Sequence, residues 1–184
     1  YDQTTPQLLG LALGIYGLTQ AGLQIPFGMW SDRWGRKPII TLGLIIFILG
    51  SLVAATSDSI YGLITGRALQ GAGAVAASIM ALAADLTTAQ HRTKAMALIG
   101  MSIGVAFSLA FVIGPLLFSH IGINGLFYIG AVLAALAITI LWLVVPKPVN
   151  QQTRSSISID NFKSVLFDNH LIKLNFSIFS SHLI

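Results

Sequence analysis

The sequence predicts an all-α membrane protein, a bundle of helices that cross a lipid bilayer. Hydrophobic residues fill 55% of its 184 positions and charged residues only 9%, against about 25% charged residues in an ordinary globular domain. The apolar residues form long continuous runs, close to the ~20 residues that a spanning helix needs. They do not alternate with polar residues as barrel strands do. Together these observations exclude a soluble fold.

Five of the apolar runs are long enough to span the membrane. In chain order they cover residues 7–31, 38–55, 60–85, 95–119 and 125–145. The connections between them are short, so neighbouring helices are expected to run antiparallel. These connections cover residues 32–37, 56–59, 86–94 and 120–124.

The positions of Lys and Arg predict the orientation of the bundle. Cations occupy the first and third connections and the segment after the fifth run, whereas the opposite connections hold none. They are Arg33, Arg36, Lys37, Arg92, Lys94, Lys147, Arg154, Lys163 and Lys173. The positive-inside rule places this side in the cytoplasm. The net charge of +4 therefore reflects membrane topology, and no nucleic acid partner is expected.

The composition changes after the fifth run. Residues 146–173 are polar and are expected to form a cytoplasmic linker that contains a short amphipathic helix at the membrane surface. Residues 174–184 are apolar but too few to span, so we expect them to begin a further helix. The first residue is Tyr1 rather than Met, and we expect the chain to be part of a longer protein.

The first connection carries a motif of charged residues and glycines. Asp32 and Arg36 are opposite charges at a tight turn, Gly35 gives that turn its backbone freedom, and Pro38 can begin the next helix without its missing N–H. A basic turn that only fixes topology is the alternative. The candidate residues of this motif are Gly28, Asp32, Arg33, Gly35, Arg36 and Lys37.

A second motif surrounds Arg67, the cation that lies inside a predicted span. A cation in hydrocarbon costs about 2.5–3.5 kcal/mol on insertion scales, so Arg67 should face protein or a water-filled cavity. A polar stripe of small residues is expected on the same helix face, made of Gln70, Gly71, Ala74 and Ser78. A purely structural arginine that bonds carbonyls of a neighbouring helix is the alternative.

The spacing Gly-x-x-x-Asp-Arg-x-Gly-Arg-Lys resembles the loop motif between the second and third helices of the major facilitator superfamily. The run from Arg67 to Gly71 resembles the Arg-x-x-Gln-Gly motif of that family's fourth helix. The likeness to drug/proton antiporter-like members covers the whole chain. It implies a partial N-terminal six-helix bundle, with helices two to six in residues 1–145, the linker in 146–173 and the start of helix seven in 174–184.

The resemblance implies secondary active transport, with proton-coupled efflux of small, drug-like molecules by alternating access. No cofactor is expected, since the proton gradient is the driving force. The implied partners are the lipid bilayer, a small-molecule substrate and the C-terminal half of the same protein, and the implied location is a bacterial inner membrane. A symporter or uniporter of sugars or metabolites is the first alternative, and a structural membrane protein without transport activity is the second. No enzymatic activity is expected.

The resemblance also assigns roles to residues. Asp85 ends the third run on the same side as the first connection and is the acid at that boundary besides Asp32, so we expect Arg36 to bridge the two. The resemblance implies that this bridge acts as a conformational switch. The candidates for proton coupling or for the cavity wall are Tyr16, Gln20, Gln24, Arg67, Gln70 and Gly71. Gly114 and Pro115 are expected to kink the fourth run. No catalytic or metal-binding residue is expected.

Overall fold

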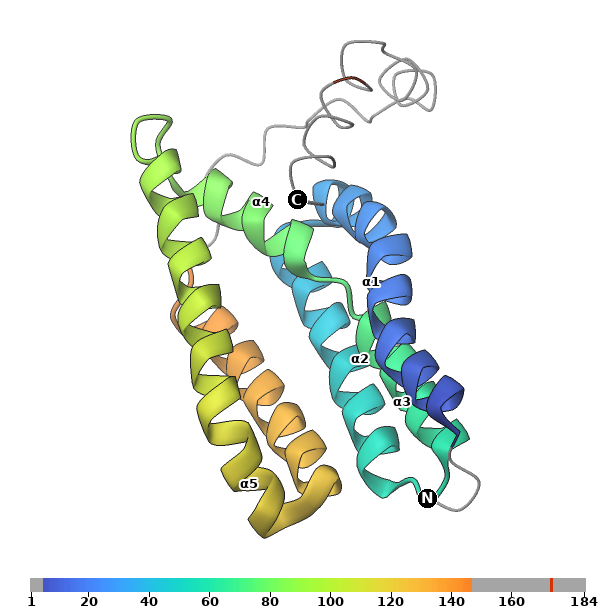
Figure 1. The fold of residues 1–184 in the computed structure, drawn as a ribbon. Helices are drawn as coiled ribbons and strands as arrows, with labels where there is room; N and C mark the ends of the chain where they lie inside the picture. The colour runs from blue at the N-terminus through green and yellow to red at the C-terminus, as the bar shows by residue number, and fades with distance from the viewer. Residues whose placement is uncertain (1–4, 147–172, 174–184) are drawn as a thin grey trace. The chain divides into compact units, whose positions relative to one another are not determined.

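The computed structural model describes residues 5–146 and residue 173. The described helices belong to one compact unit, residues 1–150, and none of the described backbone forms a strand, which confirms the all-α prediction. The linker helix expected in residues 146–173 and the span expected from residue 174 lie outside the described part, apart from residues 146 and 173. The helices are α1 Pro6–Trp34, α2 Arg36–Thr56, α3 Ile60–Ala72, α4 Ala76–Leu86 and α5 Arg92–Leu143 (Figure 1).

A single residue separates α1 from α2. Gly35 has φ 98° and ψ 150°, a backbone region that is essentially restricted to glycine. The chain reverses there, and α2 begins at Arg36 with Pro38 in its first turn, where proline costs no hydrogen bond. Because no loop intervenes, the charged residues on either side of Gly35 are held close together.

The third predicted span is not one continuous helix. It was expected over residues 60–85, but α3 ends at Ala72 and α4 begins at Ala76. The break falls in a run of glycine and alanine, and glycine is a poor helix former. A Cβ atom at Gly73 would also lie only 2.4 Å from the carbonyl oxygen of Gly43, so α2 approaches the break closely. The expected stripe from Arg67 to Ser78 is therefore interrupted.

Helix α5 contains both of the last two predicted spans. At about 1.5 Å per residue, its 52 residues would reach roughly 78 Å if straight, far beyond a hydrocarbon core of about 30 Å. Gly122 has φ 66° and ψ −174°, and the helix folds back there into two arms (Figure 1). The second arm buries Ala131, Ala134 and Leu141.

The surface of the bundle is apolar. Within the described residues, four segments are long and apolar enough to cross a membrane: α1, α2, the α3–α4 segment and α5. Large apolar side chains such as Leu13 and Phe111 are 72% and 80% exposed, which suits lipid as the solvent. Trp30 and Trp34 stack at the end of α1 that carries Arg33, where tryptophan belts mark a membrane interface. The chain is thus a membrane protein.

Candidate functional site

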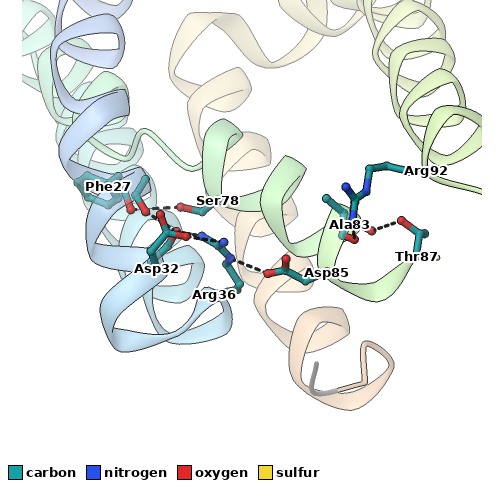
Figure 2. Close-up of polar contacts among 11 residues, drawn as sticks. Phe27, Asp32, Arg36, Ser78, Ala83, Asp85, Thr87 and Arg92 are labelled. Atoms are coloured by element: carbon teal, nitrogen blue, oxygen red, sulfur yellow. Dashed lines mark hydrogen bonds and ion pairs between the residues drawn. The ribbon is translucent and has the colours of Figure 1, made fainter. Parts of the chain in front are cut away.

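Arg36 lies at the centre of a cluster of charges that joins three helices. Its Nη2 atom is 2.5 Å from Asp32 Oδ1 and its Nε atom is 2.9 Å from Asp85 Oδ2. Its Nη1 atom donates to Ser31 Oγ at 2.8 Å, and this hydroxyl donates in turn to the carbonyl of Gly28. Figure 2 shows Arg36 between the two carboxylates. The bridge that the sequence predicted is present, and Asp32, Arg36 and Asp85 are called the charge cluster below.

Each member of the charge cluster lies at a helix end that disfavours its charge. Arg36 is the first residue of α2, while Asp32 and Asp85 lie in the last turns of α1 and α4. The helix dipole favours anions at N-termini and cations at C-termini, the reverse of this arrangement. The dipoles therefore oppose all three charges, and the ion pairs hold the cluster together. Neutralising Arg36 would remove its ion pair from both acids, whereas neutralising one acid would leave Arg36 with the other.

Burial differs among the three side chains. The side chain of Arg36 is 7% exposed and that of Asp85 is 20% exposed, whereas that of Asp32 is 33% exposed. A nearly dry guanidinium requires partners, because a buried unpaired charge is costly. Asp32 is the member with most accessible surface, so a segment beyond these helices can reach it.

The other motif residues have different surroundings. Lys37 is 6% exposed, its Nζ atom donates to the carbonyl of Val145, and it lies 5.6 Å from the ring centroid of Trp142. Arg33 is exposed in the last turn of α1, where the dipole favours a cation. A Cβ atom at Gly28 would meet another atom only at 3.9 Å, so packing within the described helices leaves room for alanine there.

Arg67 contacts protein groups, as the free-energy cost of a cation in hydrocarbon predicted. Its Nη1 atom donates to Gln70 Oε1 at 2.9 Å, and its guanidinium lies 4.5 Å from the centroid of the Tyr16 ring. Gln70 is buried and donates from Nε2 to Ser51 Oγ at 2.8 Å. Ser51, in the apolar run of α2, was not a sequence candidate, because a serine among apolar residues carries no local signal of its partner.

Gly71 brings α1 and α3 together beside this group. A Cβ atom there would lie 2.2 Å from the carbonyl oxygen of Tyr16 and 2.1 Å from Thr19 Oγ1, so only glycine fits without a shift of backbone. Tyr16, Gln20 and Gln70 are the polar side chains that line a cavity of about 390 Å³ between the helices. The sequence thus predicted residues that gather at one place.

Other sequence candidates lie apart from this cavity. Gln24 is partly buried on α1 but is absent from the described cavity wall. Ser78, which was expected to share a stripe with Arg67, instead donates to the carbonyl of Phe27 at 3.4 Å (Figure 2). Gly114 and Pro115 lie in the first arm of α5, where the described backbone keeps helical dihedral angles; the abrupt change comes later, at Gly122. No described group of three or more His, Cys, Asp or Glu side chains could hold a metal ion.

Comparison with known families matches residues 2–183 to the Major Facilitator Superfamily. The chain belongs to this superfamily. Its relatives within the superfamily include the inner membrane transport protein YajR of Escherichia coli, which is 50% identical over 179 residues, covering 96% of this chain and 39% of that protein. The match to a superfamily of transporters fits the helices, the two motifs and the charge cluster described above.

Two further superfamily members are named for drug resistance. Multidrug resistance protein D of Escherichia coli is 41% identical over 107 residues, covering 57% of this chain and 27% of that protein. The class B tetracycline resistance protein of Escherichia coli is 31% identical over 157 residues, covering 82% of this chain and 38% of that protein. The chain thus spans about two fifths or less of the length of these relatives.

Proposed function

We propose that the full-length protein containing this chain is a proton-coupled transporter that exports small, drug-like molecules across a bacterial inner membrane by alternating access. The observation that carries the proposal is the charge cluster, in which one buried arginine joins α1, α2 and α4. Similarity to a multidrug resistance protein and to a tetracycline resistance protein supports drug-like substrates.

The charge cluster serves in this proposal as a latch on the cytoplasmic side. Asp32 keeps 33% of its side-chain surface accessible and can contact the N-terminus of a helix in the other half of the protein, where the helix dipole favours an anion. That contact would hold the cytoplasmic side closed. Protonation of Asp32 or Asp85 would remove one ion pair and loosen the latch, which links proton entry to the conformational change.

Arg67 is the proposed coupling residue inside the α3–α4 span. Its described contacts are with neutral groups, the amide of Gln70 and the ring of Tyr16, so a carboxylate or a polar substrate group from another part of the protein can approach it. Cations inside spans are expensive and commonly mark substrate or ion pathways. Binding of such a group would connect transport to the state of this cation.

Transport by the full-length protein in proteoliposomes tests the proposal. A pH gradient imposed across the membrane should drive movement of ethidium or tetracycline, and a protonophore should abolish it. The Arg67→Ala variant should lose most of this movement, while Arg92→Ala, at an exposed position, should keep it. If neither probe responds to the gradient, or if Arg67→Ala transports like the wild type, the proposal is wrong.

The latch has its own measurement. Spin labels on the cytoplasmic ends of the two halves report their separation, and Asp32→Asn should lengthen it by favouring the inward-open state. Asp58→Asn is the matched control, because Asp58 is an exposed acid beyond the other end of α2. Unchanged separations in Asp32→Asn would contradict the latch.

A further inference from the structure

A continuous chain of hydrogen bonds links the backbone of α2 to the guanidinium of Arg67. Ser51 Oγ donates to the carbonyl of Phe47 at 2.8 Å and accepts from Gln70 Nε2 at 2.8 Å. Gln70 Oε1 then accepts from Arg67 Nη1 at 2.9 Å. Ser51, Gln70 and Arg67 are called the polar relay below. Its two inner members are almost inaccessible, at 0% exposure for Ser51 and 4% for Gln70.

The direction of the relay follows from the chemistry of its members. A serine hydroxyl has one proton, and Ser51 donates it to the carbonyl of Phe47. Toward Gln70 it can therefore only accept, so the amide nitrogen of Gln70 must face Ser51. The amide oxygen then faces Arg67, which has donors and no acceptor. Ser51 thus fixes which end of the Gln70 amide meets the guanidinium.

Close packing of two helices brings the relay together. A Cβ atom at Gly50 would lie 2.5 Å from the backbone nitrogen of Gln70 and 2.7 Å from the carbonyl oxygen of Gly66. A Cβ atom at Gly66 would in turn lie 2.6 Å from the backbone nitrogen of Ala54. The backbones of α2 and α3 are therefore in contact, and this places Ser51, the neighbour of Gly50, against the side chain of Gln70.

The position of the relay gives it a consequence for transport. Arg67 is held on one side by Gln70 and on another by the face of Tyr16, and both of these residues line the cavity. A guanidinium has five N–H donors, and the described contacts use one of them. A cation fixed in this way keeps its remaining donors in a defined direction, which favours a ligand that arrives in one geometry.

We propose that Ser51 is the positioning residue of Arg67, acting through the amide of Gln70 to orient the guanidinium. The expected effect of Ser51 on transport rests on the proposed function, whereas its expected effect on the orientation of the Arg67 side chain does not. Loss of the hydroxyl would leave a buried amide without an acceptor, and the guanidinium would lose its fixed orientation.

Nitrogen NMR of arginine side chains in the full-length protein tests this directly. Hindered rotation of a fixed guanidinium gives separate signals for Nη1 and Nη2, and loss of the Arg67 signals in Arg67→Lys assigns them. Ser51→Ala should merge the two signals. Ser51→Cys, which keeps the size and a weaker acceptor, should give an intermediate result and covers the case in which Ser51→Ala fails to fold. Ser102→Ala is the matched control, since Ser102 makes the same type of bond to the carbonyl four residues earlier but is exposed.

Transport in proteoliposomes gives a second readout. Ser51→Ala should lower the rate of proton-driven ethidium movement about 2- to 10-fold, the range expected for one neutral hydrogen bond. In a Gln70→Leu background the same change should have no further effect. An undiminished effect in that background, or separate Arg67 signals in Ser51→Ala, would overturn the proposal.

The two readouts also separate this inference from the proposed function. Merged signals together with transport that ignores a protonophore would retain the positioning role and refute proton coupling. Separate signals together with proton-driven transport would refute the positioning role and retain the proposed function.

Discussion

Double-mutant cycles on the charge cluster will show whether burial or distance decides the strength of its two ion pairs. The pair of Arg36 with Asp32 is the shorter, at 2.5 Å against 2.9 Å for the pair with Asp85. Asp32, however, is 33% exposed and Asp85 only 20%. Exposed ion pairs contribute about 0.2–1 kcal/mol, while hydrogen bonds to charged groups contribute about 1.5–3 kcal/mol. The expected coupling energies are about 0.5 kcal/mol with Asp32 and about 1.5 kcal/mol with Asp85.

The measurement combines Arg36→Met with Asp32→Asn and, separately, with Asp85→Asn. The free energy of unfolding of the full-length protein in detergent is obtained from a denaturant titration that is followed by tryptophan fluorescence. Asp58→Asn with Arg36→Met is the control, and these distant changes should be additive within about 0.5 kcal/mol. A coupling with Asp32 that equals or exceeds the coupling with Asp85 would refute the reasoning from burial.

Three further predictions concern positions with defined geometry. Gly35→Ala should lower the free energy of unfolding by about 1–3 kcal/mol, the cost of forcing a glycine-only backbone region on alanine. In the same denaturant titration Gly10→Ala should cause no loss, because within the described residues no side chain or other helix lies within 4 Å of a Cβ there. Equal losses for the two variants would contradict the strain at Gly35. Gly66→Ala should cost about 1–3 kcal/mol through overpacking against α2, and a stability equal to the wild type would show that the two helices can separate freely. Lys37→Met should raise the hydrogen-exchange rate of the backbone around Trp142 about tenfold, as expected for the loss of a hydrogen bond to a charged group, and unchanged exchange would exclude Lys37 as an anchor of α5.

The site features that could be predicted from the sequence involve charged residues, which are scarce in this chain. Charged residues are few, so the positions of Asp32 and Asp85 at one boundary left Arg36 few choices of partner, and the bridge could be predicted without coordinates. The cost of a cation in hydrocarbon predicted in the same way that Arg67 faces protein. When charged residues are few, each has few possible ion-pair partners. Short connections reduce the number further, because they fix which helix ends lie on the same side of the membrane.

The features that were missed depend on how helices cross. Ser51 reaches Gln70 only because α2 and α3 touch at Gly50 and Gly66, and that crossing is set by three-dimensional packing that one run of sequence does not contain. The break between α3 and α4 had a local signal in its glycine and alanine residues, but an apolar run of that length equally suggests a continuous span. The anchoring of Lys37 by Val145 joins residues 108 positions apart, a separation at which sequence pattern gives no pairing.

The long sequence separations between Arg36, Lys37 and their acceptors also order the assembly of this region during synthesis. The acceptor of Arg36 on α4 lies 49 residues later in the chain, and the acceptor of Lys37 lies 108 residues later. At roughly 5–20 residues per second, Lys37 emerges roughly 5–20 s before the carbonyl that it will bind. During that interval the two cations have not yet met these acceptors, and the positive-inside rule predicts that they keep their end of α2 on the cytoplasmic side. Arg36 and Lys37, which that rule predicts to orient the chain during insertion, thus become buried and paired once the later helices are in place.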